Sequence, residues 1–120
     1  MYEGPLEFSQ RRKEQHKKVL ERAGQEIKRF HNLDNQVYRE GTLPKETKEL
    51  LGLVASFVLR CDDCIKYHLI QCHEVGVGEE QIEEALSVGL LVGGSITIPH
   101  LRKAFQFWDQ LTLTGEENTG

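Results

Sequence analysis

The sequence lacks the features that mark membrane, nucleic-acid-binding and secreted proteins. Its longest apolar stretch, Ala85–Ile98, is interrupted by serine and glycine and is shorter than the roughly 20 residues of a membrane-spanning helix. The net charge of -4 disfavours a general nucleic-acid surface, and Glu14 interrupts the basic run at residues 11–13. Residues 1–5 have neither the charged start nor the apolar centre of a secretory signal. We therefore expect a cytoplasmic protein with no membrane and no nucleic-acid partner.

Cysteine is also scarce, and strand patterns are almost absent. Three cysteines in 120 residues are too few for a disulfide framework, and in a reducing compartment a close CxxC pair is typical of a redox or metal site. Only residues 95–98 alternate between polar and apolar side chains, and this stretch is too short to build a sheet. A chain of this length suits one domain with one core. The predicted fold class is all-α, with about six helices.

The first 40 residues predict an N-terminal helical extension. Residues 1–8 are expected to form a loose arm. Apolar residues recur at helical spacing from Ser9 to His31, which predicts one amphipathic helix that Gly24 weakens locally. A short helical piece is expected at Leu33–Glu40. The apolar stripe of the first helix is thin, so it packs either on the domain or against another subunit.

Residues 41–113 predict the core domain. Its first helix carries Pro44 in its first turn and ends near Arg60. The following helices are expected at residues 61–75 and 79–93, and a last helix starts from a cap at residue 95 or 97. Gly89 is expected to allow a close approach between helices. Residues 114–120 are polar and predict a disordered tail.

The most informative stretch begins at Cys61. It places Cys61 and Cys64 three residues apart and His68 four residues further on, and helical geometry puts all three on one stripe with Cys72. Thiolate is the reactive form of cysteine, and the start of a helix favours negative charge. His68 can take or return a proton, and Glu49 is one of the few carboxylates placed to turn inward and orient that imidazole.

Three kinds of function fit this pattern. The first is a thiol oxidoreductase, in which one cysteine attacks a hydroperoxide or disulfide, the other resolves the product, and an external thiol reductant restores the pair without a bound cofactor. The second is a redox-responsive helical assembly or binding module without turnover. The third is a zinc site, but four ligands strung along one straight helix cannot enclose an ion, so no metal is expected. The cysteines can also be simple core residues, and Cys72 is interpreted as one.

The spacing of Glu49, Cys61, Cys64 and His68 is similar to that of a known family. A glutamate, eleven residues, CxxC, three residues and histidine resemble the AhpD-like alkylhydroperoxidase branch of the carboxymuconolactone decarboxylase superfamily. The resemblance continues through residues 76–85. It implies a thiol-dependent peroxidase or disulfide reductase. The decarboxylases of that superfamily lack CxxC, so lactone decarboxylation is not expected.

The resemblance also implies roles and an assembly. It makes Cys64 the peroxidatic and Cys61 the resolving cysteine, with Glu49 and His68 in the proton relay, whereas position at the helix start alone slightly favours Cys61 as the attacker. Asp63 stands where the family peroxidase has a histidine, which adds negative charge near the thiols. The family forms homotrimers or homohexamers, and an oligomer also follows from the apolar turn at residues 90–92. A monomeric mass in sedimentation would contradict it.

Overall fold

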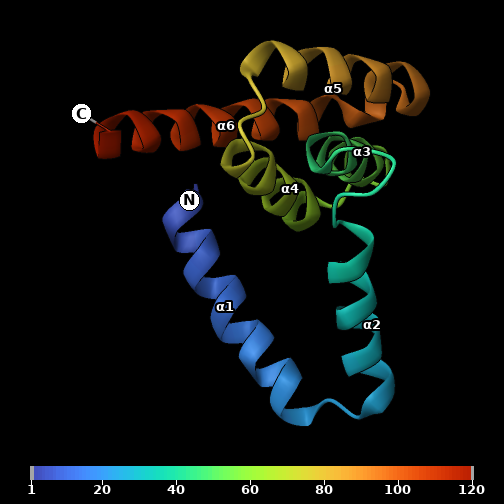
Figure 1. Ribbon diagram of the computed structural model, residues 1–120. Coiled ribbons are helices and arrows are strands. Elements are labelled where there is room, and N and C mark those ends of the chain that lie inside the picture. The colour runs from blue at the N-terminus through green and yellow to red at the C-terminus, as the bar shows by residue number, and fades with distance from the viewer. Residues whose placement is uncertain (1, 120) are drawn as a thin grey trace.

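The structure is a computed structural model that describes the backbone of residues 2–119 and the side chains of residues 2–113. The described residues form helices and no strand, as the all-α prediction required (Figure 1). The elements are α1 (Pro5–Arg22), α2 (Gln25–Val37), α3 (Lys45–Val58), α4 (Asp62–Glu74), α5 (Glu79–Gly93), the 3-10 helix η1 (Ser95–Thr97) and α6 (Ile98–Thr119). The tail expected at residues 114–120 lies outside the fully described residues, so its disorder stays a prediction.

Helix α4 lies at the centre of the molecule. It packs against α3, α6 and α1, while α3 also packs against α5. Figure 1 shows that α3 to α6 form a bundle and that α1 and α2 form a helical hairpin that extends from one side of it. The largest fully buried apolar side chains come from several of these elements: Phe8, Leu53, Phe57, Leu69, Ile82, Leu86, Phe107 and Trp108. The CxxC helix is therefore held on several sides at once.

The N-terminal extension is helical, but its helices are not the ones that the sequence pattern predicts. The single helix over Ser9–His31 is wrong, because Ala23 and Gly24 adopt extended backbone and separate α1 from α2. Glycine has a low helix propensity, so the chain breaks there at little cost and α2 turns back toward the bundle. The helical piece expected at Leu33–Glu40 is helical only through Val37, and it is the end of α2 and not a separate helix.

The start of the chain is anchored rather than loose. Pro5 opens α1, where its missing N–H leaves no bond unmade, and Phe8 is only 1% exposed with its ring edge-on to Phe107 at 5.9 Å. Glu3 accepts hydrogen bonds from Arg11 Nε at 2.6 Å and Lys66 Nζ at 3.2 Å, and these bonds hold the pKa of Glu3 at about 2. The prediction of a loose arm at residues 1–8 is therefore wrong: apolar contact and ion pairs fix this segment to α4 and α6.

The core helices follow the sequence pattern closely. Pro44 caps α3, α5 starts and ends within the predicted range, and α4 begins directly after Cys61. The expected close approach at Gly89 is confirmed, because a Cβ there would lie 2.7 Å from Phe57 Cδ1. Glycine thus lets α5 pack tightly on α3 and keeps α3 in place for the site.

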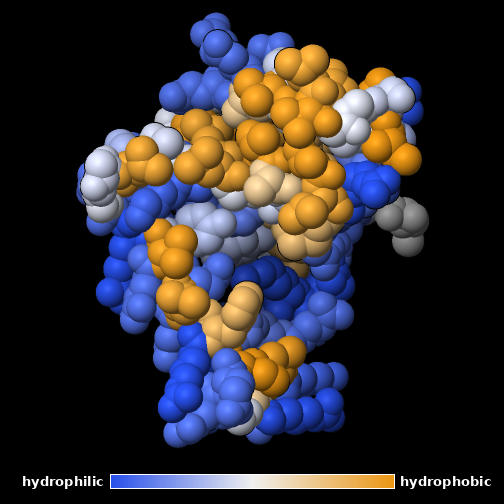
Figure 2. Space-filling view, turned by 90° about the vertical axis from the view of Figure 1, so that its right-hand side faces the viewer, coloured by the Kyte–Doolittle hydropathy of each residue, from blue (hydrophilic) through white to orange (hydrophobic). Residues whose placement is uncertain are grey.

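Apolar side chains remain exposed on this single chain. Figure 2 shows a hydrophobic area on the upper part of one face, and α5 and η1 carry Leu91 at 85%, Val92 at 71% and Ile96 at 60% exposure. None of the described helices is long and apolar enough to cross a membrane. The expected assembly into trimers or hexamers stays a prediction.

Replacing Phe8 by alanine tests whether α1 is anchored by its aromatic contact. We expect Phe8→Ala to lower the free energy of unfolding by about 3 kcal/mol, because truncating a buried aromatic ring leaves a cavity and loses its transfer free energy. The matched control is Leu6→Ala, since Leu6 is 70% exposed. Urea unfolding followed by circular dichroism measures both. Equal midpoints for the two variants would contradict the docking of α1.

Candidate active site

A tight turn between α3 and α4 sets the two cysteines at the start of the central helix. Arg60 adopts a left-handed backbone with φ of 60°, and Cys61 then donates its N–H to Ser56 O at 3.1 Å. Cys61 is the N-cap of α4, and its Sγ accepts the N–H of Cys64 at 3.3 Å. The two residues are joined by a disulfide across 5.2 Å between their Cα atoms. The two cysteines therefore lie within the usual Cα separation of a disulfide.

His68 lies one helical turn after Cys64 and is held by a buried carboxylate. Its Nδ1 is 3.0 Å from Glu49 Oε1, and Glu49 is 1% exposed on the inner side of α3. A carboxylate only accepts hydrogen bonds, so Nδ1 carries the proton and Nε2 is left as an acceptor in the neutral ring. The structure thus brings together all four residues that the sequence singled out: Glu49, Cys61, Cys64 and His68.

Three residues that sequence reasoning did not select complete the surroundings of this pair. Tyr38 Oη lies 3.4 Å from His68 Nε2, and burial, with help from nearby carboxylates, raises the pKa of Tyr38, so the phenol stays protonated and donates to Nε2. Lys45 Nζ lies 3.3 Å from Glu49 Oε2. Lys45 lies four residues before Glu49, a spacing that brings two side chains together on a helix, so the sequence already contained a signal for this contact. No sequence pattern pointed to Tyr38, which follows α2.

The third residue is Gly52, and the close packing around the imidazole requires it. A Cβ at this position would lie 2.5 Å from Tyr38 Oη and 2.6 Å from His68 Cε1. Real side chains do not reach such distances, so any larger residue displaces the phenol, the imidazole or both. From the sequence, Gly52 is only a helix-weakening glycine inside α3. The need for glycine there follows from the positions of Tyr38, at the end of α2, and His68, on α4.

A hollow of about 270 Å³ opens beside Cys64 and His68. Helix α4 supplies the two reactive side chains and Tyr67, while α1 and α2 supply most of the opposite wall. The lining residues are Phe8, Arg12, Phe30, His31, Asp34, Asp63, Cys64, Tyr67 and His68. The first helix was expected only to pack on the domain or against another subunit, whereas in the structure α1 and α2 line the hollow together with α4.

Two acidic residues, Asp62 and Asp63, lie between the cysteines, and each is bound by basic side chains. Asp63 accepts hydrogen bonds from Arg11 Nη2 at 3.0 Å and Nη1 at 3.2 Å, which offsets its charge beside Cys64. Burial opposes the ionisation of Asp62, but hydrogen bonds from His100 at 2.7 Å and Lys103 at 3.1 Å outweigh it and lower the pKa of Asp62. The negative charges at the start of α4 are thus compensated by α1 and α6.

The third cysteine is separate from this pair. Cys72 is 0% exposed within the core, and burial raises the pKa of its thiol to about 12, with a further contribution from Glu49. Cys64, by contrast, is exposed and Cys61 is half-buried, so the stripe that the helical spacing predicts runs from the exposed Cys64 to Cys72 in the core. Among residues 2–119 no group of three or more His, Cys, Asp or Glu is arranged to hold a metal ion.

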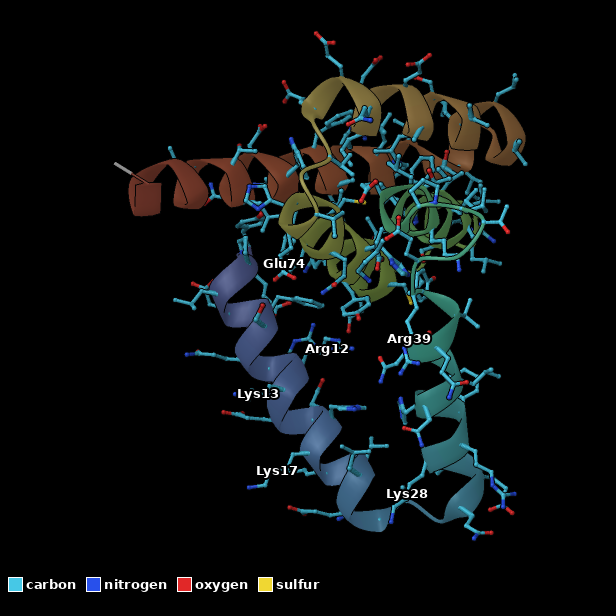
Figure 3. The ribbon with its side chains drawn as sticks, viewed as in Figure 1. Arg12, Lys13, Lys17, Lys28, Arg39 and Glu74 are labelled. Carbon is cyan, nitrogen blue, oxygen red and sulfur yellow. A yellow bond between two sulfur atoms is a disulfide. The ribbon has the colours of Figure 1, made fainter. Side chains whose placement is uncertain are left out.

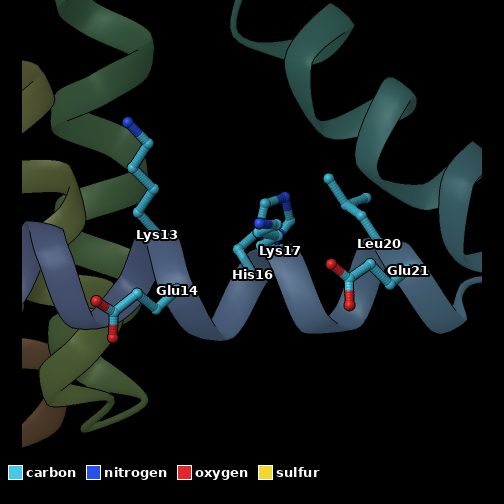
Figure 4. A pocket seen from close by; sticks show the side chains of 6 residues that line it. All are labelled: Lys13, Glu14, His16, Lys17, Leu20 and Glu21. Atoms are coloured by element: carbon cyan, nitrogen blue, oxygen red, sulfur yellow. The ribbon is translucent and has the colours of Figure 1, made fainter.

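A larger hollow of about 620 Å³ lies along α1 and has no link to the cysteines. Figure 4 shows that its lining side chains all come from this one helix. They carry charges of both signs, basic at Lys13 and Lys17 and acidic at Glu14 and Glu21. The hollow beside Cys64 is therefore the better candidate for chemistry.

Comparison with known proteins identifies the family. Residues 26–107 match the model of the carboxymuconolactone decarboxylase family. The chain belongs to this family. Two crystal structures of one Thermotoga maritima protein resemble this chain at 51% and 54% identity over 94% of it, with TM-scores of 0.89 and 0.87. The first of them describes that protein as a carboxymuconolactone decarboxylase family protein with a suggested part in the antioxidative response. The match to this chain covers 96% and 97% of the length of those two structures.

Two more distant proteins are also similar to this chain. An uncharacterised protein from the cox locus of Paracoccus denitrificans is 32% identical over 82 residues, which is 68% of this chain and 74% of that protein. A family member from Legionella pneumophila shares the fold, with a TM-score of 0.81 at 20% identity over 88% of this chain and 94% of that one. The resemblance to this family drawn from the CxxC and histidine spacing is confirmed.

Replacing Gly52 by alanine tests the packing around His68. We expect Gly52→Ala to break the bond between His68 Nδ1 and Glu49, because the added Cβ occupies the space of the imidazole. The measurement is the hydrogen-bonded imidazole N–H proton resonance in NMR, which should disappear. Gly89→Ala is the matched control, since its Cβ meets core Phe57 and not the site. An unchanged resonance in Gly52→Ala would refute the geometry.

Proposed function

We propose that this member of the carboxymuconolactone decarboxylase family is a thiol-dependent oxidoreductase that reduces hydroperoxides or disulfides through Cys61 and Cys64. The observation that carries the proposal is that Cys64, already disulfide-linked to Cys61, shares a hollow with His68, whose imidazole is fixed by buried Glu49. The suggested antioxidative part of the Thermotoga maritima protein, 51% identical to this chain, is consistent with it.

The proposed reaction of a hydroperoxide has two steps. The Cys64 thiolate attacks the outer oxygen of ROOH, the O–O bond breaks, and ROH leaves with one proton while Cys64 becomes a sulfenic acid. The Cys61 thiolate then attacks Cys64 Sγ, the S–O bond breaks, and water leaves as the disulfide forms. An external dithiol returns two electrons and two protons and is itself oxidised to a disulfide.

His68 serves as the proton carrier in this scheme. With Nδ1–H donated to Glu49, Nε2 is the free base that accepts the thiol proton and returns it to the leaving alkoxide. The hydrogen bond from Tyr38 holds Nε2 in place between transfers. Glu49 stabilises the imidazolium that forms, because an opposite charge within hydrogen-bond distance favours the charged ring.

The structure supports Cys64 as the attacking residue. Cys64 lines the hollow and is exposed, while Cys61 is half-buried and is not part of the lining. Cys64 also lies in the first turn of α4, where the helix dipole lowers the free energy of a thiolate. The disulfide closes within one turn and connects no two helices, so its formation moves little of the fold. This local character favours turnover over a redox-controlled assembly.

Substitutions at the site test the proposed reaction. We expect Cys64→Ser to abolish hydroperoxide reduction by the dithiol-supplied enzyme, and His68→Gln to slow it at least about hundredfold, because general acid–base catalysis contributes on that order. Peroxide consumption under steady-state conditions is the measurement. Cys72→Ser is the matched control and should turn over like the wild type, since Cys72 is buried away from the hollow.

Two results would contradict the proposal. Wild-type activity in Cys64→Ser would remove the proposed nucleophile. No peroxide or disulfide consumption by the wild type, together with a change in particle size on reduction, would instead favour a redox-responsive module.

A further inference from the structure

The hollow beside Cys64 contains a cation, Arg12, that forms no ion pair with any side chain of residues 2–113. Arg12 lies with its guanidinium carbon 4.2 Å from the centre of the Tyr67 ring, and no acidic side chain of residues 2–113 lies within ion-pair distance of it. Its neighbour Arg11 differs, because Arg11 is bound to both Glu3 and Asp63. A guanidinium stacked on an aromatic face keeps its N–H donors at the edge available for a ligand.

Arg12 is an exposed residue whose side chain lines the hollow. Figure 3 shows Arg12 extending from α1 toward α2, whereas Lys13 and Lys17 extend from the opposite side of α1. Arg12 and Cys64 both line the same hollow. A ligand whose reacting end meets Cys64 therefore lies with its other end within the field of Arg12.

Aromatic side chains supply the rest of the wall. Phe30 is 67% exposed at the hollow, which is unusual for a phenylalanine unless something covers it, and Tyr67 presents its ring on the α4 side. The volume of about 270 Å³ is just below the usual range for small-molecule sites, so it suits a single ring or a short chain. Aromatic walls that carry a placed cation suit an amphipathic acid, although Asp34 is also among the lining residues.

We propose that this hollow selects small hydroperoxides that combine an aromatic or other apolar body with a carboxylate, and that Arg12 is the residue that binds the carboxylate. The inference rests on the proposed function, because it assigns the substrate class of the same site. Guanidinium and carboxylate form paired N–H···O bonds, so the acid group orients the ligand as well as attracting it. The peroxide end then points to Cys64.

One carboxylate in the wall provides a second, opposite test. Asp34 lines the hollow from α2 and repels an anion, while the charge of Asp63 is offset by Arg11. Neutralising Asp34 should therefore strengthen the binding of an acid, whereas neutralising Arg12 should weaken it. A merely structural role of Arg12 predicts no such pair of opposite effects.

The binding experiment uses the oxidised wild-type protein and two probes that cannot react, 4-isopropylbenzoate and 4-isopropylbenzamide. Calorimetric titration should give an affinity for the acid about tenfold higher than for the amide, the size of one charge-assisted hydrogen-bonded contact. Arg12→Gln should abolish this preference, Asp34→Asn should increase it, and the neighbouring control Lys13→Gln should retain it. Equal affinities in the wild type, or a preference that survives Arg12→Gln, would overturn the inference.

The turnover experiment separates this inference from the proposed function. With 4-carboxycumene hydroperoxide and cumene hydroperoxide, the ratio of kcat/KM values should favour the acid about tenfold in the wild type and fall to about one in Arg12→Gln. Turnover of both substrates at equal efficiency would overturn the inference and leave the peroxidase proposal standing. Acid-selective binding without any turnover would contradict the peroxidase proposal and leave the assignment of Arg12 as a carboxylate-binding residue standing.

Discussion

The hydrogen bond between the carboxylate of Glu49 and the imidazole of His68 is the constraint around which this molecule is built. A carboxylate that is 1% exposed has lost its water, and such a group is costly unless a partner satisfies it. The partner, 3.0 Å away, comes from the next helix. Lys45 contributes a further contact, but it is substantially exposed and is correspondingly weaker. Removing either member of the buried pair leaves the other unpaired inside the core.

This one bond explains several features that otherwise look unrelated. It requires α3 and α4 to lie close together, and Gly52 on α3 leaves the space that His68 of α4 and Tyr38 at the end of α2 occupy. It fixes which imidazole nitrogen faces the hollow. It also directs the function, since a base held beside a thiol is more useful to redox chemistry than to a packed core. Cys72 lies one helical turn beyond His68 on α4, buried in the core, with a thiol that stays protonated.

Helices α1 and α2 form the walls of the hollow beside the cysteines at the start of α4. Phe8 and the contacts of Glu3 anchor α1 to α4 and α6, and this anchoring carries Arg12 to the hollow. Helix α2 returns along the other side because the chain breaks at Ala23 and Gly24. The bundle thus supplies the thiols and the base, and the hairpin supplies the surface against which a substrate would lie.

The core helices and the four central site residues were accessible from the sequence because their signals are local. The apolar spacing of α3 and α5 and the separation of Cys61, Cys64 and His68 are properties of short windows. The placement of Phe8 and Tyr38 was not accessible, because each depends on contacts with residues distant in the chain. The break between α1 and α2 was missed for a related reason: Gly24 weakens a helix, but only the return of α2 to the bundle makes the break favourable.

The most direct test of the account is the rate at which the reduced protein reacts with hydroperoxide in a single turnover, measured by rapid mixing across pH for the wild type and Glu49→Gln. The account predicts a rate at least about tenfold lower in Glu49→Gln and an altered pH profile, because the imidazole loses the carboxylate that orients and charges it. Glu46→Gln, an exposed position on the same helix, should behave like the wild type. Superimposable rates and profiles for wild type and Glu49→Gln would contradict the central claim.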